Sequence, residues 1–197
     1  MTSCHVGLQA LRDRPAAIVT ACRTFGFTDL FMPAVPPDMR GMDAAGWRAV
    51  GKELGDMAQQ FAQHGMSLGY HNHHWELEEK EGGKTALEIL FEASAGSPLK
   101  WQVDVAWLVR GGADPKEWMN RYTTRISAAH VKDIAPAGTN LDQDGWADVG
   151  HGVLDWKDLW TACRFYGAHW MVVEHDKPAD PGQSARNSLA FLRTIAG

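Results

Sequence analysis

The chain has 197 residues, of which 45% are apolar and 22% are charged, and its formal net charge is −5. This length suits one domain with a sizeable core and hardly two, so we expect residues 1–197 to form a single domain. The acidic balance gives no electrostatic basis for binding nucleic acid or an anionic membrane. The sequence contains no apolar run of about 18 residues, so we expect no transmembrane helix.

Strand-like and helix-like segments alternate along the chain. The first strand-like run, Ser3–Leu8, precedes a helical segment, Pro15–Phe25, which has proline in its first turn and Gly26 just beyond its end. The later segments follow in the same order: strands Asp29–Met32, Ser67–His71, Leu99–Val103, Ile126–Val131 and Trp170–Glu174, and helices Ala44–Gln63, Thr85–Ala95, Pro115–Tyr122, Asp155–Phe165 and one within Gly182–Ile195.

This alternation predicts an α/β fold with a parallel sheet and right-handed crossovers. We count six βα units in the sequence. Two loops, 33–42 and 134–154, are long and rich in Gly, Pro and Asp, and each follows a strand. Long loops after strands are where a βα barrel carries its chemistry.

Four of the strand-like runs end in a side chain that can bind a metal, namely His71, Asp104, His130 and Glu174. Taken singly, each has a plainer interpretation. Asp104 can cap a helix, His130 can be a hydrogen-bonded structural residue, and Glu174 can begin a solvated loop. Because the carboxyl ends of parallel strands converge in a barrel, their joint occurrence indicates one metal site.

Mixed imidazole and carboxylate ligands favour a divalent ion such as Mn²⁺, Co²⁺, Fe²⁺ or Zn²⁺, with Mg²⁺ as an alternative. Such an ion can bind a hydroxyl and a neighbouring carbonyl, which acidifies the carbon-bound proton between them. Strand alternation sends His71 and His73 to the same side, and Glu76 follows shortly after. This pattern predicts proton-transfer chemistry at a metal.

Three tryptophans, Trp75, Trp107 and Trp146, fall just after strand ends. Core packing is the plainer explanation for the nine tryptophans of the chain. The flat rings of Trp75 and Trp107, together with His73, also suit the apolar face of a sugar, and we predict that they bind substrate.

The N-terminal residues Met1–His5 contain neither a basic region nor an apolar one, so they predict no signal peptide. The three cysteines, Cys4, Cys22 and Cys163, are odd in number and widely spaced. They fit reduced thiols in a cytosol better than a disulfide framework, and they predict a cytoplasmic protein.

Five segments together resemble the xylose isomerase-like TIM-barrel superfamily, a sugar phosphate isomerase/epimerase group that also contains inosose dehydratases. These segments are Gly69–Glu76, Val103–Trp107, Ala129–Asp133, Asp148–Trp156 and Val173–Glu174. Family barrels have about eight βα units, whereas this chain corresponds to the family from its third strand onward. The resemblance therefore implies a partial (β/α) TIM-type barrel of about six parallel strands, and we expect it to form a homo-oligomer that covers its exposed edge.

The resemblance also implies a ligand set made of a strand-end Glu, an Asp, a His and a second Glu. By position the last three correspond to Asp104, His130 and Glu174. The first corresponds to His71, where many relatives have Glu, or to Glu76.

The resemblance further implies an acid/base pair of two glutamates. With histidine at the first ligand position, Glu174 is the expected base and His71 or His73 the expected proton donor. Lys132 is a further alternative for the donor.

The leading hypothesis is an enzyme of carbohydrate metabolism, a metal-dependent isomerase or epimerase that removes a proton next to a metal-bound carbonyl of a sugar or keto-sugar. The alternative is a lyase that dehydrates a keto-inositol or eliminates from a 3-keto sugar. A third hypothesis is a non-catalytic barrel remnant that binds a sugar or a partner. The predicted partners are a small sugar and further copies of the chain, without nucleic acid or membrane.

Overall fold

The computed structural model describes residues 2–196, whose contacts form two compact units. One unit ends at Gln102 and the other begins at Val103. The boundary falls inside strand β6 (Lys100–Asp104), so this strand contributes residues to both units.

The first unit contains parallel strands in the order β1-β2-β3-β6. Strands β1 (Ser3–His5), β2 (Asp29–Met32) and β3 (Ser67–His71) confirm the predicted strand positions. The predicted strand Ser3–Leu8 is wrong in its second half, because Leu8 begins helix α1 (Leu8–Asp13). Leu8 and Leu11 lie one helical turn apart and both are buried, which favours a helix over a continued strand.

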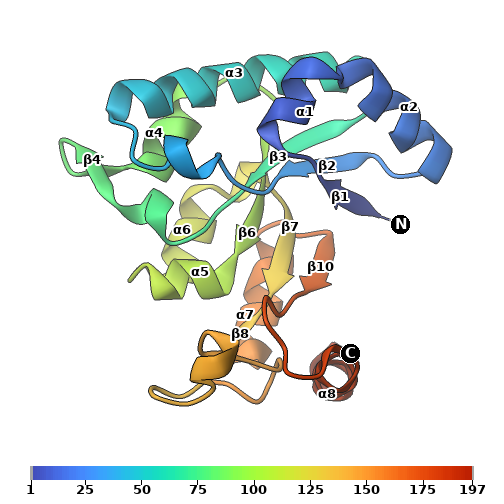
Figure 1. Cartoon of the computed structure of the whole chain (residues 1–197), viewed down its shortest axis with the longest axis vertical. Coiled ribbons are helices and arrows are strands. Elements are labelled where there is room, and N and C mark those ends of the chain that lie inside the picture. The colour runs from blue at the N-terminus through green and yellow to red at the C-terminus, as the bar shows by residue number, and fades with distance from the viewer. Residues whose placement is uncertain (1, 197) are drawn as a thin grey trace. The chain divides into compact units, whose positions relative to one another are not determined.

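Besides α1, the first unit contains helices α2 (Pro15–Phe25), α3 (Ala44–Ala62) and α4 (Ala86–Ala93). Helix α3 packs on α4 and on β3, and α2 packs on α1. In Figure 1, α3 runs along the top of this unit next to α4. A β-carbon at Gly51 of α3 would lie 2.4 Å from the carbonyl oxygen of Leu90, so glycine is needed for this close approach.

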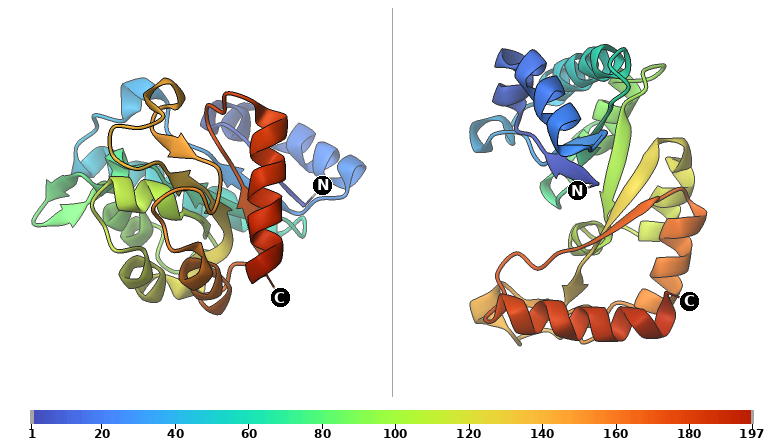
Figure 2. Two further views of the ribbon diagram at one scale, coloured as in Figure 1. Left: turned by 90° about the horizontal axis from the view of Figure 1, so that it is seen from below. Right: turned by 90° about the vertical axis from the view of Figure 1, so that its right-hand side faces the viewer.

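The second unit contains the end of β6 with two further parallel strands, β7 (Ile126–Val131) and β10 (Trp170–Val173), in the order β6-β7-β10. In Figure 2 the C-terminal helix is the long red helix that follows the loop after β10. The helices of this unit are α5 (Val105–Arg110), α6 (Pro115–Arg121), α7 (Trp156–Phe165) and α8 (Pro181–Ile195).

The loops contain short elements that the sequence did not reveal. Two are hairpins, β4 (Glu79–Glu81) with β5 (Lys84–Thr85), and β8 (Asp133–Ile134) with β9 (Trp146–Ala147). The others are single 3₁₀ turns, η1 (Pro37–Met39), η2 (Trp75–Leu77), η3 (Thr123–Arg125) and η4 (Leu141–Gln143).

Six parallel strands connected by helices confirm the predicted α/β class and the TIM-barrel type of fold. Within residues 2–196, none of the helices has the length and apolar character needed to cross a membrane.

Candidate active site

Asp104 has two roles in the second unit, because its two carboxylate oxygens face different partners. As the last residue of β6, it accepts a hydrogen bond from the backbone N–H of Trp107 at 2.9 Å and so caps helix α5. Its Oδ2 atom lies 3.6 Å from His130 Nδ1 and 3.5 Å from Lys132 Nζ. The helix-cap interpretation of Asp104 therefore describes one oxygen, and the other oxygen is directed at the predicted ligands.

The parallel register of β7 and β10 brings His130 and Glu174 together. Val172 pairs with His130, and the backbone N–H of Glu174 donates to the carbonyl oxygen of Val131 at 3.1 Å. His130 Nδ1 then donates to Glu174 Oε2 at 2.9 Å. One nitrogen of His130 and one oxygen each of Asp104 and Glu174 lie within 4.8 Å of one another.

Lys132 is fully buried among carboxylates in the same unit. Its ammonium nitrogen lies 2.8 Å from Glu174 Oε2 and 2.8 Å from Asp176 Oδ2. The sequence indicated Lys132, but it did not reveal that Asp176 holds it. An acid two residues after a strand-end glutamate was the available signal. The five residues that meet here, called the carboxylate cluster below, are Asp104, His130, Lys132, Glu174 and Asp176.

The charges of the carboxylate cluster shift the pKa values of its members in opposite directions. Burial disfavours the charged imidazole, but Asp104 and Glu174 outweigh it and raise the pKa of His130 to about 9. Burial also acts against the charged Glu174 carboxyl, yet His130 and Lys132 hold its pKa well below its usual range. The pKa of Lys132 is raised in the same way, since Asp104 and Glu174 outweigh its burial. The cluster is thus a set of mutually neutralising charges.

The donor atoms of Asp104, His130 and Glu174 fit a divalent metal ion. One imidazole nitrogen and two carboxylate oxygens are a ligand set that Mn²⁺, Fe²⁺, Co²⁺ and Zn²⁺ accept. All three side chains come from strand ends, which hold them firmly in place. The two cations already beside these carboxylates show that the position attracts positive charge.

Aromatic rings form one wall beside Lys132. The ring of Trp107 meets that of Trp146 edge to face at a centroid distance of 4.7 Å, and Lys132 Nζ lies 4.7 Å from the Trp146 ring. The Arg110 guanidinium also stacks on Trp146, with its carbon 3.2 Å from the ring centroid. Trp146 is buried, whereas Trp107 is only partly buried, so Trp107 is the ring of the two that a ligand can reach.

The loop after β7 is organised by a buried carboxylate. Asp133 accepts hydrogen bonds from the backbone N–H groups of Ile134, Gly150, Gly152 and Leu154 at 2.9–3.1 Å. A β-carbon at Gly152 would lie 2.3 Å from Asp133 Oδ1, so only glycine permits this approach. The predicted long loop 134–154 is therefore an ordered structure, held by the carboxylate of Asp133, the residue that precedes it.

The first unit places a different group of side chains at its strand ends. His71 ends β3, and its ring lies 5.4 Å from the ring of His5 and 5.0 Å from that of His73, measured between centroids. The ring of His73 stacks on Trp75 at 4.1 Å. His5 Nε2 lies 2.6 Å from Gln102 Oε1. These four rings, called the ring ladder below, are His5, His71, His73 and Trp75.

Glu76 is a buried carboxyl held by neutral donors. The Tyr70 hydroxyl donates to its Oε1 atom at 2.6 Å, and the His73 backbone N–H donates to its Oε2 atom at 2.8 Å. Burial raises its pKa to about 7, although these hydrogen bonds and the charge of Arg40 act in the opposite direction. The sequence proposed Glu76 only as a ligand, and its partnership with Tyr70 became visible only in the structure.

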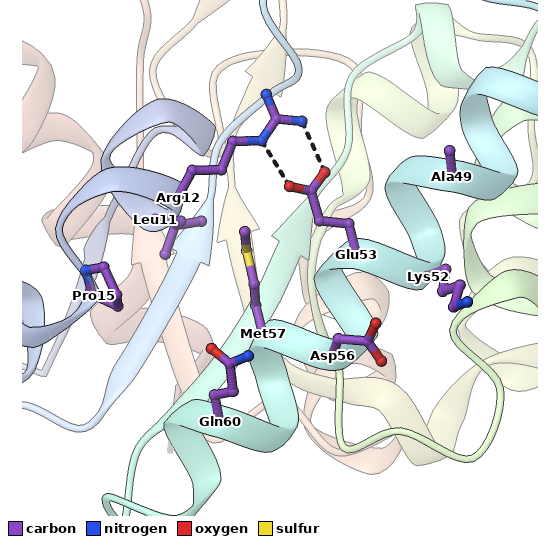
Figure 3. A pocket seen from close by; sticks show the side chains of 9 residues that line it. All are labelled: Leu11, Arg12, Pro15, Ala49, Lys52, Glu53, Asp56, Met57 and Gln60. Atoms are coloured by element: carbon purple, nitrogen blue, oxygen red, sulfur yellow. Dashed lines mark hydrogen bonds and ion pairs between the residues drawn. The ribbon is translucent and has the colours of Figure 1, made fainter.

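A groove of about 530 Å³ in the first unit contains none of the predicted site residues. It lies between α1 and the start of α2 on one side and α3 on the other (Figure 3). Arg12 crosses it to Glu53 with two hydrogen bonds of 2.7 and 2.8 Å, drawn as dashed lines in Figure 3. Because the groove lies among helices and away from the strand ends, it belongs neither to the carboxylate cluster nor to the ring ladder.

Comparison with known proteins agrees with the fold. Residues 9–195 match the profile of the family described as "Xylose isomerase-like TIM barrel". The chain belongs to this family. The match covers the ring ladder from His71 onward and the whole carboxylate cluster.

Among curated proteins, an inosose dehydratase of Lacticaseibacillus casei is 30% identical over 159 residues, which are 72% of this chain and 51% of that protein. The chain thus spans about half the length of the curated relatives it matches. Among solved structures, a sugar phosphate isomerase/epimerase from Parabacteroides distasonis superposes with a TM-score of 0.75 at 20% identity, covering 98% of this chain and 70% of that one. The 3-keto-D-glucoside 4-epimerase of E. coli gives 0.70 at 18% identity, covering 98% and 79%. The two structures show the fold alone.

Proposed function

We propose that the chain is a metal-dependent enzyme that removes a proton next to the carbonyl of a keto-sugar or keto-cyclitol. The observation that carries this proposal is the convergence of Asp104, His130 and Glu174 within 4.8 Å, with Lys132 beside them. Family membership supports it, because isomerases, epimerases and dehydratases stand among its neighbours. These reactions share an initial proton abstraction.

Asp104, His130 and Glu174 would hold the ion. A divalent ion bound there would polarise the substrate carbonyl and acidify the adjacent carbon-bound proton. His130 must be neutral to act as a ligand, so its proton has to leave before or during binding. The charge of the ion would then replace the positive charge that His130 loses. Asp104 and Glu174 would therefore still face a positive charge.

Glu174 is the side chain we assign as the base. Its Oε2 atom is shared by His130 and Lys132, and its carboxyl is partly exposed, so it can reach a substrate. The low pKa of this carboxyl makes it a weak base on its own, which is why the substrate proton must be acidified first.

Lys132 is the proton donor that the geometry supports best. Its ammonium lies 2.8 Å from the assigned base, and Asp176 holds it on the other side. A donor in this position can return a proton to carbon or deliver one to a departing hydroxide. His71 and His73 of the first unit stay predictions for the same role. The fourth metal ligand also stays a prediction, with His71 or Glu76 as the candidate.

Isomerisation or epimerisation is the first candidate for the complete reaction, and dehydration is the second. The second is favoured by one specific observation, since curated relatives that match at 25–30% identity are inosose dehydratases. A dehydratase needs an acid for the leaving oxygen, and Lys132 supplies one. An epimerase needs a donor on the opposite face of the substrate.

Deuterium exchange separates these outcomes. Purified protein is loaded with Mn²⁺ and incubated in D₂O with a panel of keto-sugars and keto-inositols, and carbon-bound deuterium is measured by mass spectrometry. Exchange without loss of water indicates an isomerase or epimerase, and exchange with loss of water indicates a dehydratase. Absence of exchange from every substrate, with the metal bound, would refute the enzyme proposal and favour the non-catalytic remnant.

Self-association is a separate expectation. On β10, Trp170 and Val173 are 40% and 43% exposed, and exposed apolar side chains on a strand favour contact with a second copy. Light scattering should therefore give a mass above that of one chain. Trp170→Glu should shift it toward the monomer. A monomer at all concentrations would contradict this expectation.

A further inference from the structure

Arg40 is a candidate ligand-binding residue that neither the sequence motifs nor the carboxylate cluster includes. It lies in the loop between β2 and α3, directly after the 3₁₀ turn Pro37–Met39. Its backbone N–H donates to the carbonyl oxygen of Pro37, and that of Met39 donates to Pro36 at 2.9 Å. Two prolines and these hydrogen bonds fix the backbone that presents the Arg40 side chain.

Strand register places this loop beside the ring ladder. Strands β2 and β3 are parallel neighbours, with Met32 opposite Tyr70, so the segments that follow them leave the sheet at the same edge. The Arg40 guanidinium carbon lies 3.9 Å above the centroid of Trp75, a member of the ring ladder. Stacking on an indole fixes the plane of the guanidinium and leaves its N–H edge as the donor surface.

The Arg40 guanidinium lacks an anionic partner among residues 2–196. Its Nε atom is buried without a hydrogen-bond acceptor, its guanidinium stacks on the Trp75 ring, and its charge acts on Glu76 and Tyr70. The oxygens of Glu76 accept from the Tyr70 hydroxyl and the His73 backbone N–H. A fixed guanidinium with unused donors is the arrangement that recognises a phosphate or carboxylate oxyanion.

We propose that Arg40, stacked on Trp75, forms an anion-binding site of the first unit that takes a small phosphate or carboxylate oxyanion. The site is built from residues of this unit alone, and it goes beyond the proposed function, which rests on the carboxylate cluster. Phosphate and carboxylate share the chemistry that a guanidinium recognises, and separate ligands can distinguish them.

The test uses the full chain without metal, in EDTA, so that an oxyanion cannot bind through an ion. Inorganic phosphate, acetate and neutral glucose are titrated in separate calorimetry experiments. We expect an oxyanion to bind and glucose to bind more weakly. Tighter binding of phosphate assigns a phosphorylated ligand to this site, and tighter binding of acetate assigns a carboxylate ligand.

Three variants decide whether Arg40 is responsible. Arg40→Gln should weaken oxyanion binding at least tenfold, and Arg40→Lys should lose part of it, because lysine keeps the charge without the fork. Arg48→Gln is the matched control, an exposed arginine of the same unit that pairs with Glu81, and it should bind like the wild type. The proposal is overturned if Arg40→Gln and Arg40→Lys bind oxyanions as tightly as the wild type. It is also overturned if Arg48→Gln loses as much affinity as Arg40→Gln.

Catalytic data keep this proposal separate from the proposed function. If oxyanions bind through Arg40 but no keto-sugar exchanges deuterium, the proposed function fails and the anion site stands. If keto-sugars exchange deuterium but Arg40→Gln binds oxyanions like the wild type, the anion site fails and the proposed function stands.

Discussion

Two glutamates that the sequence proposed as metal ligands, Glu76 and Glu174, lie in opposite electrostatic surroundings. Glu174, in the second unit, sits between His130 and Lys132, which hold its pKa well below its usual range. Glu76, in the first unit, is buried beside Tyr70 and a backbone N–H, and its pKa rises to about 7. The same residue type is therefore kept ionised in one unit and is half-protonated near neutral pH in the other.

This difference gives the two units different chemical surroundings for a ligand. The carboxylate cluster concentrates charge, which is what an ion and a proton-transfer step require. The ring ladder offers flat, mostly neutral surfaces with hydrogen-bonding edges, which suit a sugar.

The largest effect is expected when the assigned base is neutralised. General base steps contribute about 10²–10⁴-fold, so Glu174→Gln should slow substrate deuterium exchange by at least about 10². Because Glu174 is also a proposed ligand, the exchange is measured at Mn²⁺ concentrations that saturate the variant. Glu117→Gln, on exposed helix α6, is the control and should exchange at the wild-type rate. Wild-type exchange by Glu174→Gln would remove Glu174 from the mechanism.

Loss of the buried cation should destabilise the protein. Breaking a buried ion pair costs about 3–5 kcal/mol, and we expect about 2–3 kcal/mol for Lys132→Met, because solvent screens the partly exposed carboxylates of Glu174 and Asp176. Denaturant unfolding of the metal-free protein measures this loss, and added Mn²⁺ should restore part of it.

The control for this experiment is an exposed ion pair. Lys116 pairs with Asp158 at the surface, so Lys116→Met should change the free energy of unfolding far less than Lys132→Met. Equal effects of the two substitutions would mean that the burial of Lys132 does not increase the contribution of its ion pairs to the free energy of unfolding.

The raised pKa of Glu76 predicts a pH-dependent stability of the metal-free protein. The folded-state pKa of about 7 exceeds the ordinary value of 4.5, so the unfolded state ionises first. The stability linked to this group is present below pH 4.5 and is lost as the pH rises through about 7, on the order of 3 kcal/mol. Glu76→Gln should flatten this part of the stability profile. A profile with the wild-type slope would show that other groups produce it.

Metal affinity should depend on the protonation of His130. Because its pKa is about 9 in the metal-free structure, His130 carries a proton at neutral pH that must leave when the ion binds. Release of one proton makes the affinity rise about tenfold for each pH unit between about pH 6 and 8. Calorimetry in buffers of different ionisation enthalpy measures the protons released. An affinity independent of pH would show that His130 is not a ligand.

The sequence predicted the six strands and most helices, because apolar runs and helix-end residues mark them. It missed helix α5 and assigned Leu8 of α1 to a strand, since helices of six residues are too short for a clear hydrophobic period. The 3₁₀ turns and hairpins have no apolar pattern of their own, and they became visible only as the loops folded.

The candidate site was predictable where ligands end strands, as with Asp104, His130 and Glu174. Contacts made by loops were not predictable in this way. Asp176 contacts Lys132, and Arg40 stacks on Trp75. Each contact depends on the path of a loop, which the sequence pattern does not predict. The fourth metal ligand stays a prediction for His71 or Glu76, and metal binding by each single variant would identify it.

The most direct test of the account is the metal affinity of Asp104→Asn. Asparagine keeps an oxygen that can cap α5 but loses the charge that faces His130. We predict that the wild type binds about one Mn²⁺ per chain and that Asp104→Asn binds at least about 100-fold more weakly, because a direct ligand is lost. Asp114→Asn, which changes the aspartate that caps α6, should bind Mn²⁺ like the wild type. Full affinity in Asp104→Asn would contradict a metal centre at the carboxylate cluster.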